Sequence, residues 1–429
     1  MKLEFGLEDK PPLAVSLILG LQWAFIAIST IVILGKIVSS LHFAQSQETI
    51  LYLQKLFFLT GAALIVQVVW GHRLPLISGP AAVLLIGVVS SGGAQISVIN
   101  TAIILGGIFV SLLAAAGLFR FVRKIFTARV IAVVLLLIVF TLAPTILDLM
   151  TGRSGGINPG YNFTFSVLLV LSIFFLEKAL SGIWKTGVLF FSILGGSFAY
   201  FLVFPSEWGS TGFKSVPWAM SFFSDLTIRP QIVPGVLLSF MICYLALVVN
   251  DLGSIQSLNE MLDPPDKDKR IHRGVLFTGA ANVVSGFLGV LGPVNYSLSP
   301  GVIASTRCAS RFPLILAGFL VLLLSPFPRL IGLMGSVPSV VIGGVMVYVM
   351  ASQFAAGLSI AVKGEPEGEF SFQSGIIIGL PVLLGNLIAF LPSDILEEAP
   401  ALLQPLLGNG FVAGIVCVLF LEHVIFSNR

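Results

Sequence analysis

Two hydrophobic stretches broken by proline constrain the fold of this chain most. They are residues 78–83 (SGPAAV) and 299–304 (SPGVIA), and Pro80 and Pro300 lie 220 positions apart in a chain of 429 residues. A similar element therefore recurs at equivalent places in two halves. Because proline lacks an N–H, a membrane segment broken in this way leaves backbone groups unpaired, and only surrounding protein or a water-filled cavity can satisfy them. Paired breaks in two repeats are the best sequence indicator of a transporter's substrate site.

The composition is that of a polytopic membrane protein. Hydrophobic residues make up 56% of the chain and charged residues only 10%, whereas about a quarter of the residues of a soluble domain are charged. The first apolar run begins at Leu13 and is long enough to span, so it is expected to stay as the first helix. The cysteines Cys243, Cys308 and Cys417 lack metal-ligand spacing and are interpreted as packing residues. No metal or cofactor is predicted.

Fourteen membrane segments are expected. Apolar runs of about 20 residues, the length that crosses the hydrocarbon, begin near Leu13, Ile50, Val98, Ala128, Tyr161, Lys185, Ile232, Gly274, Pro313, Val337, Ser371 and Gly408. The broken segments 74–91 and 294–310 complete the set as the third and tenth. Seven segments per half make the second half enter the membrane with opposite orientation, so the sequence predicts an all-α protein built as a 7+7 inverted repeat. The two repeats should meet near residues 206–230.

The distribution of basic residues gives an independent check on this topology. With the N-terminus in the cytoplasm, most of the 23 Lys and Arg residues fall on the cytoplasmic side, as the positive-inside rule requires. We therefore expect a multi-pass protein of the cell membrane with both termini cytoplasmic. The net charge of +3 is explained by this topology. No basic stripe with interleaved aromatic residues is present, so nucleic acid is not an expected partner.

Polar residues within the eighth segment mark a candidate site. Asn250, Ser254 and Ser257 fall at i, i+4 and i+7 and form one polar stripe, with Asp251 at its flank. Ionisable residues inside membrane segments mark substrate or ion pathways by default. One interpretation is structural, in which Asn250 and the serines bond neighbouring helices and Asp251 caps or pairs near the cytoplasmic helix end. The interpretation as a site is favoured because the broken segments independently predict a cavity at mid-membrane.

Two further stretches belong to this candidate site. Gln22 is the polar counterpart of the eighth-segment residues in the first segment, although a lone Gln more often bonds a neighbouring helix. Before Pro300 the polar and apolar residues alternate, which suits an extended stretch that leads into a half-helix. This stretch comprises Asn295, Tyr296, Ser297, Leu298 and Ser299. The N–H groups at the start of such a half-helix can bind a carbonyl or an anion, and the donors near residues 79–83 are expected to face them by symmetry.

The chain resembles the nucleobase/ascorbate transporter family, which includes bacterial uracil and xanthine permeases. The resemblance rests on residues 301–307 (GVIASTR) after Asn295-Tyr296-Ser297, on Leu21-Gln22, on the third-segment break and on residues 343–345 (GGV). It implies a core of segments 1–4 and 8–11 (residues 1–125 and 231–330). It also implies a gate of segments 5–7 and 12–14 (residues 126–230 and 331–429), a homodimer formed through the gate, and short antiparallel strands in segments 3 and 10. Backbone donors near Ala82 and Ser297 would then hold the substrate.

The chain also departs from that family at key positions. The family's eighth-segment substrate-binding Glu aligns with Asn250, which places Asp251 one residue later, and the next polar family position is Ser254. The family's tenth-segment Glu or Gln aligns with Leu298, and the common first-segment Gln-His is Gln22-Trp23. Two of the usual hydrogen-bonding anchors are therefore missing.

Two functional hypotheses follow. The first is secondary active transport of a nucleobase or a similar small planar metabolite by alternating access, coupled to protons through Asp251. The second is an anion transporter or channel of the same inverted-repeat architecture, with the substrate held by the facing half-helix ends. An enzyme is not expected, because the chain carries no HExxH, no GxSxG and no paired intramembrane aspartates.

Overall fold

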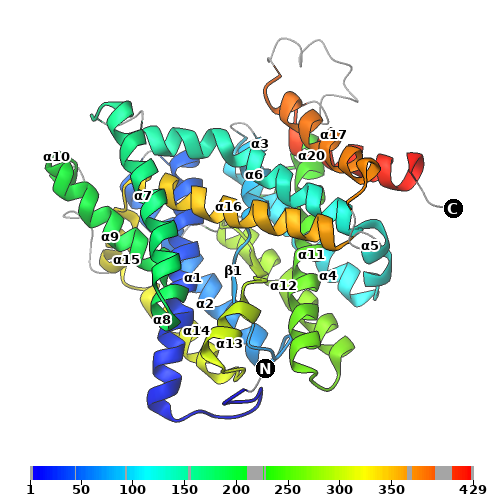
Figure 1. Ribbon diagram of the computed structural model, residues 1–429, viewed down its shortest axis with the longest axis horizontal. Helices are drawn as coiled ribbons and strands as arrows, with labels where there is room; N and C mark the ends of the chain where they lie inside the picture. Colours follow the sequence, from blue (N-terminus) through cyan, green and yellow to red (C-terminus); the bar gives the residue numbers. More distant parts are fainter. Residues whose placement is uncertain are drawn as a thin grey trace.

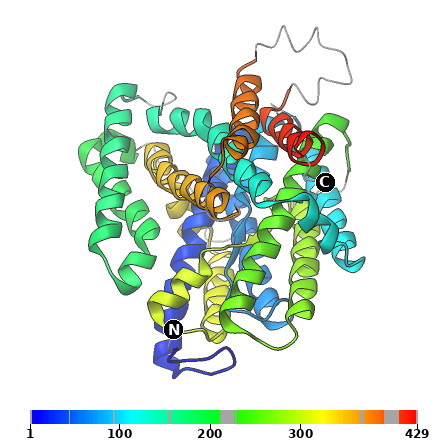
Figure 2. The same cartoon turned by 45° about the vertical axis from the view of Figure 1, so that its right-hand side comes forward.

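The computed structural model describes residues 3–43, 45–91, 94–152, 156–209, 226, 229–364, 370–391 and 408–426. These residues are mostly helical, with one two-stranded sheet (Figures 1 and 2). In chain order the elements are α1 (Leu13–His42), α2 (Ser46–Val69), β1 (Ser78–Pro80), α3 (Ala82–Ser90), α4 (Ile96–Ala115), α5 (Phe119–Ile125), α6 (Ala128–Thr151), α7 (Pro159–Ala179), α8 (Gly182–Thr186), α9 (Val188–Val203), α10 (Pro205–Gly209), α11 (Pro234–Leu262), α12 (Lys267–Leu288), β2 (Pro293–Asn295), α13 (Ser299–Thr306), α14 (Phe312–Leu324), α15 (Pro328–Gly335), α16 (Ser339–Lys363), α17 (Phe372–Ala389), α20 (Gly410–Phe420) and a π-helical turn, η3 (Leu421–Ile425).

Eight helices in the described part of the chain are long and apolar enough to cross a membrane: α1, α2, α4, α6, α7, α11, α16 and α17. The expected eleventh segment is not one straight helix, since α14 and α15 meet at an angle of 97°. Pro326 and Pro328 cause this bend, because neither can donate a hydrogen bond to the preceding turn. α9 and the stretch Gly410–Ile425 are shorter apolar helices. Fourteen crossings therefore stay a prediction. Most of the expected boundary between the repeats, residues 210–225 and 227–228, lies outside the described residues.

The two broken segments meet, as the sequence predicts. β1 pairs antiparallel with β2, with Ser78 opposite Asn295 and Pro80 opposite Pro293. Each strand is followed within a few residues by a short helix, α3 after β1 and α13 after β2. β1 lies in the middle of the molecule in Figure 1, and all six strand residues are buried. Segments more than 200 residues apart in the sequence therefore share one hydrogen-bonded centre.

The packing around the strands repeats itself in the two halves. α2 packs against α14, and α4 packs against α12 in the same way. Both crossings depend on glycine at the point of closest approach. A Cβ on Gly61 would lie 2.6 Å from the backbone N of Leu322, and one on Gly107 would lie 2.5 Å from the backbone N of Val283. Backbone-to-backbone approach through small residues is how membrane helices pack tightly without a hydrophobic driving force.

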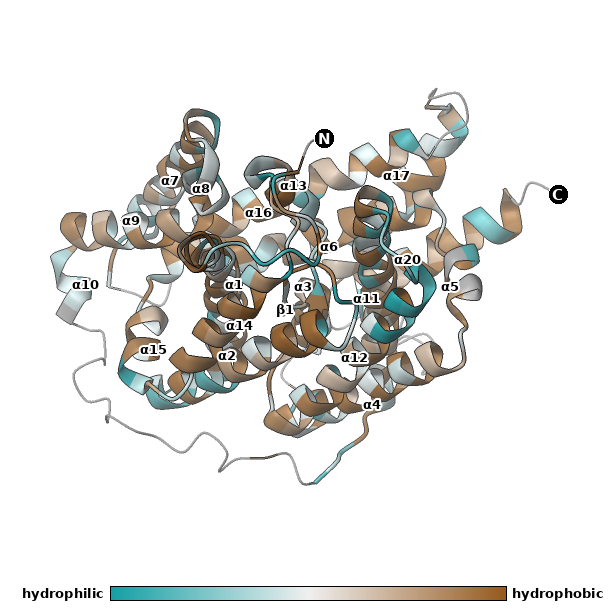
Figure 3. Ribbon diagram, turned by 90° about the horizontal axis from the view of Figure 1, so that it is seen from below, coloured by the Kyte–Doolittle hydropathy of each residue, from teal (hydrophilic) through white to brown (hydrophobic). Residues whose placement is uncertain are grey.

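A second group of helices packs mainly within itself. α16 lies along α6 and also contacts α7 and α9, while α17 packs between α6 and α20. Seen from below, α7, α9 and α10 lie on one side and α17 and α20 on the other, with α1, α2, α11, α12 and α14 between them (Figure 3). Brown, apolar residues cover most of these helices in the same view. α1 contacts α8 and α9, so it joins the central helices to the second group.

Candidate functional site

The strand pair is tied at both ends by backbone hydrogen bonds. The N–H of Tyr296 donates to the carbonyl of Ile77 at 2.9 Å, and the N–H of Ala81 donates to the carbonyl of Gly292 at 2.9 Å. α3 begins at Ala82, directly after β1. The first N–H groups of a helix have no partner within the helix and carry the positive end of its dipole. The strand crossing therefore places such donors close to the centre of the molecule.

Three polar residues of α11 converge on a single residue of β2. Ser254 Oγ donates to the carbonyl of Asn295 at 3.0 Å, and Asn250 Nδ2 donates to the same oxygen at 3.3 Å. Asp251 Oδ1 accepts from the backbone N of Asn295 at 3.1 Å and from its side-chain Nδ2 at 2.7 Å. Asp251, Ser254 and Asn295 are fully buried, whereas Asn250 is exposed. α11 thus holds both backbone groups of Asn295, and only Asn250 also faces open space.

Tyr296 bridges the two strands. Its hydroxyl donates to the carbonyl of Pro80 at 2.7 Å, and its ring passes so close to Gly79 that a Cβ there would lie 2.5 Å from the hydroxyl oxygen. Ser299 adds a second link, since its Oγ accepts from the N–H of Ile77 at 3.1 Å and is fully buried. Tyr296 and Ser299 therefore fix the geometry of the strand crossing.

An open face lies beside this crossing. It comprises the exposed residues Asn250, Gly253, Ser297, Leu298 and Gly301 of α11, α13 and the turn before α13. A Cβ added to Gly253 or Gly301 would meet no atom within 4 Å. Asp251 is the only acidic residue in residues 250–257 and 293–306, and it points to Asn295. The open face therefore offers amide, hydroxyl and backbone groups but no exposed carboxylate from these stretches.

Gln22 does not join the polar residues of α11. It is buried in α1, and its Nε2 donates to Thr186 Oγ1 at the end of α8. Phe25, almost one turn further along α1, stacks on Phe190 of α9 with ring centroids 4.4 Å apart and planes 10° from parallel. Gln22 and Phe25 therefore form a contact between α1 and the α8–α9 region.

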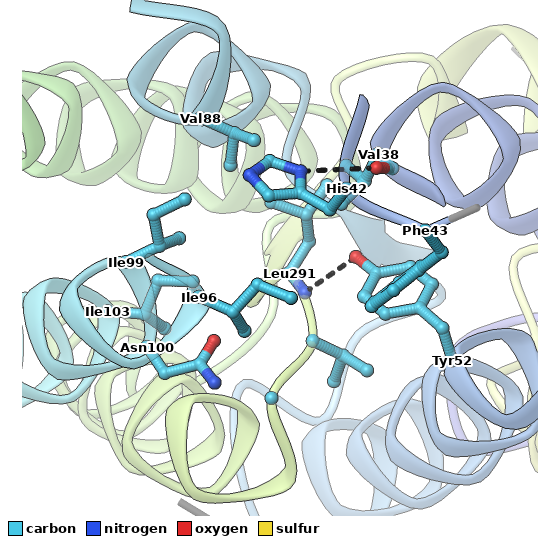
Figure 4. A pocket seen from close by; sticks show the side chains of 12 residues that line it. Val38, His42, Phe43, Tyr52, Val88, Ile96, Ile99, Asn100, Ile103 and Leu291 are labelled. Carbon is cyan, nitrogen blue, oxygen red and sulfur yellow. Dashed lines mark hydrogen bonds between the residues drawn. The ribbon is translucent and has the colours of Figure 1, made fainter. Parts of the chain in front are cut away.

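A separate small cavity lies beside the C-terminal end of α3 and the stretch 289–291 that precedes β2 (Figure 4). Its lining is mostly apolar, with Val88 and Ile99 beside the imidazole of His42. Tyr52 closes one side, where its hydroxyl accepts from the N–H of Leu291 at 3.2 Å. Figure 4 shows the few polar atoms of this cavity bonded to backbone atoms or spread around its wall, so it does not extend the candidate site.

Comparison with known proteins decides the family. A family model described as "Permease family", of the xanthine/uracil permease type, matches residues 15–393. The chain belongs to this family. It is 25% identical to the uric acid permease PucJ of Bacillus subtilis, over 89% of this chain and 86% of PucJ. It is 24% identical to the xanthine permease of the same organism, over 89% and 87%. The resemblance to nucleobase/ascorbate transporters is thus confirmed, and the permease is a transporter rather than an enzyme.

Solved structures show the same fold. The transmembrane domain of the cyanobacterial bicarbonate transporter BicA superposes with a TM-score of 0.58 at 14% identity, covering 90% of the permease and 99% of that domain. The murine anion transporter Slc26a9 in its inward-facing state gives a TM-score of 0.62 at 11% identity, covering 98% of the permease and 70% of that chain. At these identities the likeness concerns architecture alone, which is an inverted-repeat transporter fold.

Sequence reasoning missed several residues around the strands. Asn282 of α12 donates to the carbonyl of Pro293 at 2.9 Å, and Gln67 of α2 and His72 lie buried behind β2. The sequence does not indicate that His72 is buried, because residues 71–73 (GHR) include an arginine and suggest a loop on the cytoplasmic surface. Among the described residues, no group of three or more His, Cys, Asp or Glu side chains is placed to hold a metal ion.

Proposed function

We propose that the permease transports a nucleobase, such as a purine or uracil, by proton-coupled symport and alternating access. The observation that carries this proposal is the β1–β2 crossing beside an open face with the Asn250 amide at its edge. The names of the relatives, which are permeases for uric acid and xanthine, point to the same class of substrate. A planar base has carbonyl and ring N–H groups along one edge, and the open face supplies both donors and acceptors for such an edge.

In this proposal the site residues fall into two groups. Asn250, Ala82, Tyr296, Ser297 and Leu298 face or border the substrate, with Ala82 and Ser297 contributing backbone N–H groups. Asp251, Ser254, Asn295 and Ser299 lie behind them and fix the strand crossing, because all four are fully buried. Asp251 also carries the coupling proton. Gln22 belongs to the contact of α1 with α8, which opens and closes during transport.

Alternating access would move the gate (residues 126–230 and 331–429) against the core (residues 1–125 and 231–330). The separate packing of α6, α7, α9, α16, α17 and α20 supports this division. We further propose that both termini are cytoplasmic in a cell-membrane protein, and that two copies associate through the gate. Exposed aromatic and aliphatic residues on α7, such as Phe175 and Leu171, give the gate an apolar outer surface suited to lipid or a second copy.

A small anion is the second candidate substrate. Its specific support is that the open face includes the N-terminus of α13 and has no exposed carboxylate from its own stretches, and a helix N-terminus favours anions. Uptake into proteoliposomes separates the candidates. Radiolabelled xanthine, uric acid and uracil should accumulate under an inward proton gradient, and bicarbonate should not. Bicarbonate uptake without nucleobase uptake would replace the first proposal with the second. Nucleobase uptake that does not depend on the proton gradient would contradict proton coupling.

A further inference from the structure

A buried polar cluster lies beside β2. It consists of Gln67 of α2, His72 in the following loop, Asp251 of α11, Thr278 of α12 and Asn295 of β2. Gln67 Nε2 donates to Thr278 Oγ1 at 2.9 Å and to the carbonyl of Gly274 at 2.9 Å. The Thr278 hydroxyl also lies near the Asp251 carboxyl, and the side chain of His72 lies near that of Asn295. Four elements and one loop thus bring these five side chains into one buried group.

Three atoms of this cluster are left without a hydrogen-bond partner. They are Gln67 Oε1, His72 Nε2 and Asp251 Oδ2, and each is buried. The exposed fractions of the three side chains are 3%, 0% and 0%. A buried polar atom that lacks a partner is costly, and such groups in folded proteins normally bond to protein or to an ordered water. Thr278 lies next to Gln67 and Asp251, and Asn295 lies next to Asp251 and His72, so the three unpartnered atoms belong to one group of neighbouring side chains.

The backbone fixes which of these atoms donates. The N–H of Leu74 donates to Nδ1 of His72 at 3.0 Å, so the neutral imidazole carries its hydrogen on Nε2. The cluster therefore offers one donor, His72 Nε2–H, and two acceptors, Gln67 Oε1 and Asp251 Oδ2. One water molecule matches this set, because it can accept one hydrogen bond and donate two. A bare cation does not match it, since the N–H would point at positive charge.

We propose that this cluster is a buried proton-binding site, in which a water bridges His72, Gln67 and Asp251 and the transported proton binds Asp251 Oδ2. The inference rests on the proposed proton coupling and adds its location and its neighbours. His72 is a positioning residue, because its Nε2–H holds the water that stabilises the carboxylate. The charged groups beside the cluster are Arg270 and Arg73. The Arg270 guanidinium donates to the carbonyls of His72 and Arg73 at 3.2 and 2.7 Å.

Proton binding at this site acts on β2 directly. The ionised carboxylate accepts two hydrogen bonds from Asn295, and bonds to a charged acceptor are about twice as strong as neutral ones. Protonation of Oδ2 removes that charge and weakens the hold on Asn295. The carbonyl of Asn295 is also bonded to Asn250, which borders the open face. A change in the charge of Asp251 therefore affects Asn250 through a single residue of β2, Asn295.

Hydrogen–deuterium exchange of the purified permease without substrate tests the site. After correction for intrinsic exchange by reference peptides from α16, the peptide that contains β2 should be protected at high pH and lose protection as the pH falls. In Asp251→Asn the protection should no longer depend on pH. In His72→Leu the midpoint should move to higher pH by about one unit, the effect of losing one hydrogen bond to the charged group. Gln67→Leu should move it in the same direction.

Gln54→Leu is the matched control. Gln54 lies on the same helix as Gln67, is equally buried and bonds the carbonyl of Ser325, far from β2 along the chain. Its variant should keep the wild-type midpoint. The inference is overturned if β2 protection in the wild type is independent of pH, or if His72→Leu and Gln67→Leu both superpose on the wild type. Because no substrate is present, a pH-dependent β2 combined with uptake that ignores the proton gradient would contradict only the proposed function.

Discussion

At the scale of single residues, the most informative pair is Asn250 and Asp251. Successive residues on a helix point about 100° apart, so one of them reaches the open face and the other faces the edge of β2. The sequence reveals that this stretch of α11 is polar. It does not reveal which residue faces the opening, because that depends on where β2 lies, and β2 is brought there by segments far away in the chain. The structural and the functional interpretation of this stretch therefore both apply. Its side chains hold β2, and one of them, Asn250, also borders the open face.

Asn250→Ala should weaken substrate binding without unfolding the protein. The exposed amide is lost from the open face, while Ser254 and Asp251 still hold Asn295. The loss of one hydrogen bond of about 1–2 kcal/mol corresponds to a rise in KM of about 5–30-fold. Initial uptake rates over a range of substrate concentrations measure this. Gln256→Ala is the control, because Gln256 bonds Glu260 along the helix, and its KM should stay at the wild-type value. An unchanged KM in Asn250→Ala would contradict the proposal that Asn250 contacts the substrate.

Gly79→Ala should damage the strand crossing through Tyr296. The new Cβ would lie 2.5 Å from the Tyr296 hydroxyl oxygen, so the ring must shift and its hydrogen bond to the carbonyl of Pro80 is disturbed. We expect uptake to fall by at least tenfold. In the double variant Gly79→Ala/Tyr296→Ala the collision is absent, so the damage should be less than the product of the two single effects. Multiplicative effects in uptake assays would show that the two residues do not interact.

At the scale of elements, the sequence predicts the repeat but not how the helices of the two halves pack together. Pro80 and Pro300 predict two broken segments that face each other, because both need partners for their freed backbone groups. The glycines at the α2–α14 and α4–α12 crossings are not predictable in the same way, since a glycine inside an apolar helix gives no sign of which helix approaches it. The bend between α14 and α15 was predictable from Pro326 and Pro328, yet the apolar composition of this stretch suggests a single span.

Gly279→Val should destabilise the protein strongly. A Cβ on Gly279 would lie 2.4 Å from Ser111 Oγ, 2.7 Å from the backbone N of Ser111 and 2.9 Å from the carbonyl O of Gly107, and the two backbone atoms cannot turn away as a flexible side chain can. Overpacking of this kind costs about 1–3 kcal/mol or more, which thermal unfolding in detergent should register as a lower melting temperature. Gly195→Val is the matched control, because a Cβ on Gly195 of α9 meets no atom within 4 Å. Equal melting temperatures for the two variants would contradict the close crossing of α4 and α12.

At the scale of the whole molecule, the question is what moves. α1 belongs to the central helices through its packing on α14 and α2, yet it also contacts α8 and α9 of the other group. The sequence indicates Gln22 as a polar residue in a membrane helix but cannot give its partner, because Thr186 lies 164 residues away and is one of many hydroxyls. A single polar bond and one aromatic stack form a contact that is easily remade during a conformational change. This places Gln22 at the boundary that the proposed alternating access would open.

Linking α1 to α8 should therefore stop transport while leaving substrate binding intact. In the double variant Gln22→Cys/Thr186→Cys a short bifunctional thiol reagent should join the two positions, since their side chains are in contact. Cys243 and Cys308 are buried and can remain, whereas the partly exposed Cys417 is first replaced by Ser. Joined protein should lose at least nine-tenths of its uptake in proteoliposomes but keep equilibrium binding of the labelled substrate. Each single-cysteine variant treated with the same reagent controls for modification alone. Full uptake by protein that is demonstrably cross-linked would mean that α1 and α8 move together, and the moving boundary would then lie elsewhere.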